Sequence, residues 1–285
     1  MLAGDVATSP ALMPQAPEPL RLGDAALLGA LHGPTELLPI SSSGHTTLIS
    51  ELAGLNYAKA PSQQRKPLEI ALHAGTAAAL LLFPPAEGCG GPRGLKGLAF
   101  RGAMLAPTAV AGLAGRNRVR DQLGTTATIS AGLLAGSVAM VTADRSRGTR
   151  TATDASIVDG LAIGGLQALA IWPGVSRSAM AITAARWLGF SRGASARLSR
   201  SGLVATSLAA ASLEGVQLAR EGIPRQDLPA LAVAAAGGFV SAVVARPMAT
   251  RMEMGAPLWP WALWRTALAT VTVLRIRATG DDGHR

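Results

Sequence analysis

Runs of uncharged residues recur along the chain at lengths that suit membrane-spanning helices. The longest extends from Gln122 to Ala143, and another from Leu228 to Ala245. The runs from Gly160 to Ser176 and from Ile70 to Ala86 are nearly as long. A helix that crosses the hydrocarbon core of a bilayer needs about 20 mostly apolar residues, with a range of about 17–25. The pattern therefore predicts an all-α integral membrane protein, a polytopic helical bundle.

The expected helices follow one another with short connections. They are predicted near residues 21–31, 46–54, 68–83, 97–114, 122–143, 156–172, 178–188, 198–218, 228–245 and 257–274. A single membrane domain is expected over residues 21–275. Residues 1–20, which contain four prolines, are predicted to form a disordered tail, and residues 276–285 a polar tail.

Two stretches interrupt this apolar pattern with proline, glycine and polar residues. Residues 32–45 read HGPTELLPISSSGH, and residues 172–178 read WPGVSRS. The prolines and glycines exclude one uninterrupted helix over residues 32–45. Within a membrane, non-helical backbone is tolerated only where it is buried in protein or lines a wet cavity. Both stretches are therefore predicted to be functional.

The two interruptions also resemble each other. Gly29 to His32 followed by Pro39 to Ser43 compares with Gly164 to Gln167 followed by Pro173 to Ser178, about 135 residues later. In each, a helix ends near a proline and a new helix starts at a serine cluster. Paired broken helices at corresponding positions indicate a site built from internal repeats. The two repeats are predicted to cover about 21–143 and about 156–274.

Composition supports the membrane prediction over its soluble alternative, an alanine-rich helical domain. The chain is 49% hydrophobic and 15% charged, with a mean hydropathy of +0.32, whereas soluble domains carry about 25% charged residues. Its net charge of +9 lies mainly in connecting segments. These segments lack the aromatic-interleaved basic stripe of a nucleic-acid site, so we expect no nucleic-acid partner. Basic loops beside anionic headgroups explain the charge better. The single cysteine excludes an intrachain disulfide.

The polar groups of the two interruptions together suit phosphoryl transfer. Arg177 offers a planar guanidinium for an oxyanion, phosphate above all. Serine-rich helix starts, with Ser41, Ser42 and Ser43 in the first and Ser176 and Ser178 in the second, supply hydroxyls and backbone N–H groups that also suit phosphate. Taken singly, each has a plainer explanation: a serine cluster is more often a cap, and a lone arginine more often an interface residue. Their conjunction in an apolar chain favours the functional interpretation.

Two further side chains of the first interruption complete this set. Glu36 suits a divalent cation or a general base. His45 suits proton exchange near neutral pH, although a lone histidine is more often a satisfied polar residue.

Residues 32–45 and 173–178 resemble the two signatures of the undecaprenyl-pyrophosphate phosphatase family, also called the bacitracin-resistance protein family. The likeness continues through residues 68–76, Gln167, Ser191 with Arg192, and residues 259–265, so it covers about residues 21 to 275. It implies an integral membrane enzyme with inverted repeats and two re-entrant helix pairs.

The resemblance also implies the reaction and its setting. The enzyme would remove the terminal phosphate of undecaprenyl (polyprenyl) pyrophosphate, which recycles the lipid carrier of cell-wall synthesis and confers bacitracin tolerance. It would be a multi-pass protein of the bacterial cytoplasmic membrane with its active site toward the outer face. The resemblance implies Mg²⁺ or Ca²⁺ as the cofactor and allows a homodimer.

By motif position, the resemblance assigns roles to individual residues. Ser42 would be the nucleophile, His45 its acid–base partner, and Arg177 the phosphate clamp. Glu36 would be the metal-linked carboxylate, with His32 as a second candidate ligand. Substrate binding would involve Ser41, Ser43, Gly174, Ser176 and Ser178.

The chain departs from the family pattern at several positions. His32 replaces a Glu or Gln, which removes an oxygen ligand from a site for a hard cation. Ala179 and Ala181 replace a glycine and a threonine, and Arg200 and Ala205 occupy an aromatic and a proline position. His32 and Ala181 favour an alternative, a non-catalytic polyprenyl-phosphate binder or translocator. An ion transporter using Glu69 and His73 is a weaker alternative.

Overall fold

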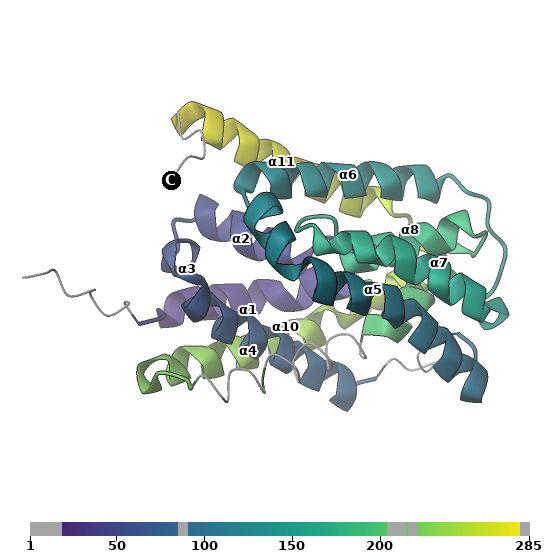
Figure 1. Ribbon diagram of the computed structural model, residues 1–285, viewed down its shortest axis with the longest axis horizontal. Coiled ribbons are helices and arrows are strands. Elements are labelled where there is room, and N and C mark those ends of the chain that lie inside the picture. The colour runs from purple at the N-terminus through teal and green to yellow at the C-terminus, as the bar shows by residue number, and fades with distance from the viewer. Residues whose placement is uncertain (1–18, 85–90, 204–214, 216–221, 280–285) are drawn as a thin grey trace, which may run out of the picture.

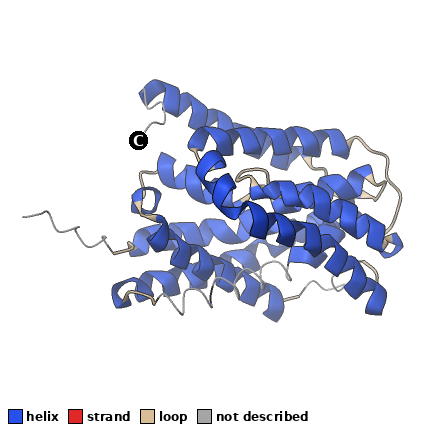
Figure 2. Ribbon diagram, viewed as in Figure 1, coloured by secondary structure: helices blue, strands red, loops and turns tan. Residues whose placement is uncertain are grey.

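The protein is built from α-helices throughout the part of the chain that the computed structural model describes, residues 19–84, 91–203, 215 and 222–279. Those residues form helices, short 3-10 turns and one isolated bridge between Arg150 and Phe190 (Figure 2). The α-helices are α1 (Leu22–Leu37), α2 (Ser42–Leu52), α3 (Asn56–Lys59), α4 (Ser62–Leu82), α5 (Gly94–Leu123), α6 (Thr126–Asp144), α7 (Ile157–Ala168), α8 (Arg177–Trp187), α10 (Leu228–Glu253) and α11 (Trp259–Thr279). The 3-10 turns are η1 (Ala152–Asp154), η2 (Leu169–Ile171) and η3 (Arg225–Asp227), and residues 192–203 are also helical. The all-α prediction is confirmed.

Three stretches are long and apolar enough to cross a membrane. They are Gly94–Gly115, Thr126–Asp144 and Arg225–Glu253. Their outer faces carry large apolar side chains without protein partners, such as Leu113, which is 83% exposed, and Val244, which is 71% exposed. Such faces suit lipid, so the chain is an integral membrane protein. Most of the expected helix at 198–218 lies outside the described residues.

The predicted tails lie largely beyond the described residues as well. Residues 1–18 and 280–285 fall outside, so the disordered state predicted for the N-terminal tail stays a prediction. At the other end α11 continues to Thr279, into the segment expected to be a polar tail.

The helices pack mainly with partners that are distant in sequence. Helix α1 packs on α10 and α10 on α4, while α5 packs on α7 and α6 on α11 (Figure 1). Glycines permit the closest approaches: a Cβ added to Gly29 would lie 2.9 Å from Cα of Gly237. One apolar cluster joins α1, α4 and α10 around Leu28 and Leu72. Another joins α5, α7 and α8 around Phe100 and Ile163.

Helix α1 runs further than the sequence indicated. The expected end near residue 31 is wrong, because the helix continues through Pro34 to Leu37. The Ser241 hydroxyl of α10 bridges the turn before the proline, accepting from the Gly33 N–H at 3.0 Å and donating to the Gly29 carbonyl at 2.6 Å. A side chain that satisfies backbone groups in this way lets a helix continue past proline. The break is therefore confined to residues 38–41.

The two breaks share an unusual backbone conformation. Ser41 and Ser176, the N-cap residues of α2 and α8, have φ angles of 78° and 76°. They are the two non-glycine residues with positive φ in the described part of the chain. The Ser41 hydroxyl accepts from the Gly44 N–H, and the Ser176 hydroxyl accepts from the Ala179 N–H, each at 3.3 Å. Strained backbone of this kind persists where the surroundings hold it and gathers at functional sites.

Candidate functional site

The two broken elements meet at a polar cavity of about 220 Å³. In Figure 1, α1 and α2 lie in the left half of the bundle and α7 and α8 in the right half. Its lining is mainly polar and comes from both elements, from α4 and from the helical residues beyond α8. The lining residues are Thr35, Glu36, Ser41, Ser42, Ser43, Glu69, His73, Ala170, Ser176, Arg177, Ser178 and Leu203. Seven of the residues that the sequence assigned to the phosphatase site thus line one cavity.

Arg177 and Glu36 form the ionic centre of this cavity. Nη2 of Arg177 donates to Oε1 of Glu36 at 2.5 Å, although the residues are 141 positions apart. The carboxylate is buried, while the Arg177 side chain keeps 30% of its surface accessible. Burial without a partner would be costly for either charge, so the pair holds both groups in place. The accessible guanidinium edge remains able to take an anion from the cavity.

The serines present two helix N-termini to the cavity. The first N–H groups of a helix have no partner within that helix. Ser41 and Ser176 cap the N–H groups of Gly44 and Ala179, which leaves the N–H groups of Ser42, Ser43, Arg177 and Ser178 for a bound anion. Two helix starts that face one cavity form an anion site.

The Ser178 hydroxyl has additional roles at the second helix start. It donates to the Leu38 carbonyl at 3.2 Å and lies 3.3 Å from the Ser176 hydroxyl. Because Leu38 belongs to the first break, the contact with its carbonyl ties the two breaks together.

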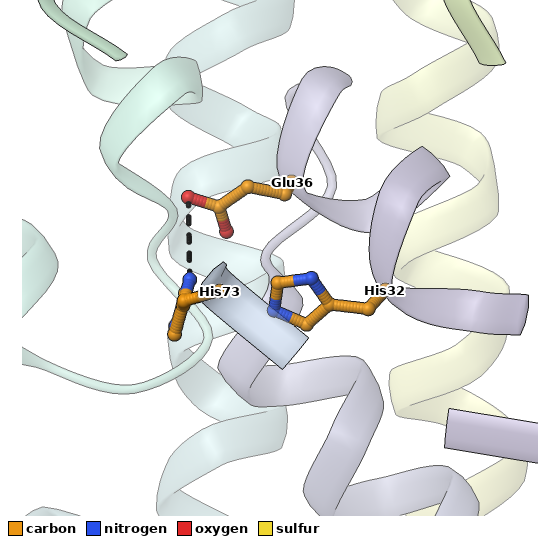
Figure 3. A group of neighbouring side chains, drawn as sticks. All are labelled: His32, Glu36 and His73. Atoms are coloured by element: carbon orange, nitrogen blue, oxygen red, sulfur yellow. Dashed lines mark ion pairs between the residues drawn. The ribbon is translucent and has the colours of Figure 1, made fainter. Parts of the chain in front are cut away.

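Three side chains cluster where this cavity adjoins a smaller one of about 90 Å³. One nitrogen from His32, one from His73 and one oxygen from Glu36 lie within 4.8 Å of one another (Figure 3). The Nδ1 atom of His73 is 4.0 Å from Oε1 of Glu36, and the two imidazole rings meet edge to face with centroids 4.6 Å apart. His32 lines the smaller cavity. The cluster joins α1 to α4.

His45 and Gly174 are not among the residues that line the main cavity. Nδ1 of His45 contacts the Ser41 carbonyl at 2.9 Å, and the Trp264 indole N–H donates to Nε2 at 2.7 Å. A carbonyl only accepts, so Nδ1 carries the proton and both ring nitrogens are engaged. The acid–base role of His45 stays a prediction. Gly174 has φ of 96°, and a Cβ there would overlap the Ile129 carbonyl, so no larger residue fits.

Sequence reasoning gave no role to Arg265, which is fully buried behind the two breaks. Its guanidinium donates to the carbonyls of Pro39 at 3.0 Å, Gly174 at 3.0 Å and Val175 at 3.1 Å, and also to Leu133 on α6. One side chain thus holds both breaks against each other. The sequence signal that could have identified it is an arginine within a mostly apolar stretch, because a charged side chain in a membrane costs free energy and is seldom without a role.

Glu69 and His73 of α4 also line the cavity, which the sequence did not predict. The sequence suggests them only for the alternative of an ion transporter, but the fold brings both to the predicted phosphatase site. Tyr57 of α3 donates to Oε1 of Glu69 at 2.6 Å, and burial together with this carboxylate raises the pKa of Tyr57 well above its usual range. Tyr57 therefore stays protonated and holds Glu69 at the cavity edge. His73 faces Glu36.

Most of the chain is similar to known proteins of one family. The family model of the bacitracin resistance protein BacA matches residues 25–90 and 93–271. The chain is 34% identical to an undecaprenyl-diphosphatase of Ruegeria pomeroyi over 268 residues, covering 86% of this chain and 95% of that protein. It is 32% identical to an undecaprenyl-diphosphatase of Nitratidesulfovibrio vulgaris over 257 residues, covering 86% and 94%. The resemblance inferred from the two signatures is confirmed.

Proposed function

The chain belongs to the family of the bacitracin resistance protein BacA, and from this premise we propose that it is an undecaprenyl-diphosphatase. It removes the terminal phosphate of the polyprenyl pyrophosphate and leaves the monophosphate. The single observation that carries the proposal is the meeting of the two serine-rich helix starts around Arg177 at one cavity. Pockets for drug-sized ligands measure roughly 300–1,000 Å³. This smaller cavity suits a headgroup, while the lipid tail stays in the bilayer.

The ion pair determines how the diphosphate binds. An incoming phosphate competes with Glu36 for the guanidinium of Arg177 and takes the N–H groups at the starts of α2 and α8. The exchange neutralises the anion without leaving the arginine unpaired. It also frees the Glu36 carboxylate, which lies within reach of the Ser42 side chain.

The chemistry follows from these positions. Ser42 Oγ attacks the terminal phosphorus as its proton passes to Glu36, and the anhydride P–O bond breaks to release polyprenyl phosphate. Water then hydrolyses the phosphoserine and restores the hydroxyl. Charge on the transferred group is held by Arg177 and by the backbone N–H groups, which are in place before the reaction.

The ligands at the site do not fit the hard cation that the resemblance implied. Of the three clustered ligand groups, only Glu36 offers oxygen, whereas Mg²⁺ and Ca²⁺ bind through oxygen. Glu69, the other nearby carboxylate, is held by Tyr57. No step above therefore depends on Mg²⁺ or Ca²⁺.

The proposal includes the arrangement in the membrane. The helix pairs α1–α2 and α7–α8 would be re-entrant, related by an inverted repeat, in the cytoplasmic membrane with the cavity toward its outer face. The matched φ angles and caps of Ser41 and Ser176 support the repeat. So does reciprocal packing, with α1 on α10 of the second half and α7 on α5 of the first.

The test is phosphate release from undecaprenyl pyrophosphate by the purified chain in detergent. The unaltered protein should release one phosphate per lipid, and Ser42→Ala should abolish turnover while still binding the substrate. Ser50→Ala, which removes a buried hydroxyl of α2 that donates to the Thr46 carbonyl, is the matched control and should stay active.

Two outcomes would overturn the proposal. Full turnover in Ser42→Ala would remove its nucleophile. Substrate binding without release in the unaltered protein would restore the binder or translocator, which the names of the relatives do not favour.

A further inference from the structure

The proposed reaction uses only Glu36 from the cluster of His32, Glu36 and His73, and it gives no role to the two histidines. We propose that the cluster binds a divalent first-row transition metal, Zn²⁺ in the first place, and discriminates against Mg²⁺ and Ca²⁺. The three groups lie on two helices that are fixed by packing, His32 and Glu36 on α1 and His73 on α4. The inference rests on the proposed function only in placing the ion beside the substrate cavity.

The ligand types set the metal preference. Imidazole suits Zn²⁺ and its transition-metal neighbours, whereas carboxylate, carbonyl and water suit Mg²⁺ and Ca²⁺. Two histidines and one glutamate form a ligand set used by zinc sites that keep a fourth position open. The relevant atoms lie within 4.8 Å of one another. Zinc bonds of about 2.0–2.2 Å would draw them closer by side-chain rotation.

The contact between Nδ1 of His32 and Thr76 leaves Nε2 of His32 available as a metal ligand. Thr76 Oγ1 lies 3.0 Å from Nδ1 of His32 and 3.4 Å from the Gly238 carbonyl. In the tautomer that carries its proton on Nδ1, His32 donates to this hydroxyl while the hydroxyl donates to the carbonyl. That tautomer has its lone pair on Nε2, and a metal ion would select it. An N–H donated to a fixed outer partner is the arrangement that orients histidine ligands in metal sites.

His73 supplies an independent observation. Its Nδ1 atom is buried and has no hydrogen-bond partner among the described residues, although it faces Glu36 at 4.0 Å. A buried polar atom without a partner needs an explanation, and an ion is one of those that recur. Figure 3 shows this nitrogen directed at the carboxylate, with the His32 ring beside it. A cation shared by the three groups would satisfy it.

The test measures metal binding to the full chain purified in detergent with a tag that contains no histidine. After chelation, the protein is dialysed against Zn²⁺ or Co²⁺, with and without a large excess of Mg²⁺ or Ca²⁺. We expect one Zn²⁺ per chain, retained in the excess, and visible d–d absorption from bound Co²⁺. Thr76→Val should weaken binding roughly 10–100-fold, as loss of an outer partner does elsewhere. His32→Ala and His73→Ala should weaken it further.

Matched variants separate the cluster from other histidines and carboxylates. The chain has four histidines, of which His32 and His73 belong to the cluster, His45 does not, and His284 falls beyond the described residues. His45→Gln, His284→Ala and Glu51→Gln should therefore keep the bound Zn²⁺. His32→Glu adds an oxygen ligand and should move the preference toward Mg²⁺ and Ca²⁺. Melting curves confirm that each variant is folded.

The results distinguish this inference from the proposed function. Absence of saturable Zn²⁺ binding would overturn the inference. So would Zn²⁺ binding in His32→Ala and His73→Ala as tight as in the unaltered protein, or displacement of Zn²⁺ by Mg²⁺. Phosphate release without Zn²⁺ binding would leave the proposed function standing alone. Saturable Zn²⁺ binding without phosphate release would support the metal site and contradict the proposed function.

Discussion

Arg177 on α8 and Glu36 on α1 form an ion pair, with Nη2 and Oε1 2.5 Å apart, across the cavity between the two broken elements. Because the substrate must take the guanidinium from Glu36, the two residues contribute differently. Arg177→Ala should lower kcat/KM by about 10³-fold or more, and Arg177→Lys should recover part of it, since lysine keeps the charge without the planar fork. Steady-state kinetics check this.

Glu36→Gln should lower kcat by about 10²-fold, the scale of a lost general base. Arg251→Ala, an exposed arginine at the end of α10, is the control and should change neither constant. An Arg177→Ala variant with normal kcat/KM would remove the arginine from the mechanism.

The engagement of both ring nitrogens of His45 predicts a positioning role. Its Nδ1–H holds the Ser41 carbonyl at the first break. Asparagine places an amide N–H near the same point, so His45→Asn should keep much more activity than His45→Ala, with an unchanged pH–rate profile. If both variants lose activity equally and one limb of the profile disappears, His45 exchanges protons as the family resemblance implied.

The positive φ angles of Ser41 and Ser176 predict that glycine is a better replacement than alanine at these positions, the reverse of the order in a regular helix. A left-handed conformation costs a residue with a Cβ roughly 1–2 kcal/mol, which glycine avoids. Loss of the serine cap costs about 1 kcal/mol with alanine and only a few tenths with glycine. Ser41→Gly should therefore be more stable than Ser41→Ala by about 2–3 kcal/mol in detergent unfolding.

Ser50, in the regular part of α2, provides the comparison. There glycine should be the worse substitution, because it is a poor helix former. The same order at both sites would contradict the strained conformation of Ser41.

The buried guanidinium of Arg265 predicts a structural requirement. Arg265→Met would leave the carbonyls of Pro39, Gly174 and Val175 without this donor and should destabilise the protein by more than about 3 kcal/mol, the scale of a broken buried charge network. Melting temperature and activity should fall together. Arg277→Ala, at the exposed end of α11, should change the melting temperature little. Normal stability in Arg265→Met would show that other contacts hold the two breaks together.

The contact between α4 and α10 predicts that Gly75 tolerates no side chain. A Cβ there would overlap the Ala235 carbonyl, whereas a Cβ at Gly23 would meet open space. Gly75→Ala should destabilise by about 1–3 kcal/mol, the usual cost of overpacking. Gly23→Ala should be neutral or slightly stabilising, since alanine is the better helix former. Unfolding curves in detergent measure both, and equal stabilities would exclude a close contact at Gly75.

The order of the helices and the identity of the breaks could be read from local sequence. Length and hydropathy of a segment determine whether it crosses a membrane. Helix α6, expected over residues 122–143, begins at Thr126 and ends at Asp144. Polar groups in an apolar chain are conspicuous, so Glu36, Arg177 and the serines were recognisable before their positions were known. Their order along the chain also carried the family signatures.

Contacts between distant segments could not be read in this way. Helix α1 continues past Pro34 because Ser241, far along the chain, bridges the backbone groups of the preceding turn. His73 follows Glu69 by one turn of α4, but the fold turns it toward Glu36. Nor did the motif indicate that Trp264 occupies the second nitrogen of His45.

The sequence by itself determined the membrane class, the two breaks and the residues that carry charge or hydroxyls, because each depends on the composition of a short segment. Only the tertiary structure decided that Arg177 pairs with Glu36, that His45 does not line the cavity, and that His32 and His73 gather near the Glu36 carboxylate. Those relationships depend on how α1, α4, α8 and α11 pack, and packing is set by side-chain shape and hydrogen bonding between segments far apart in the chain.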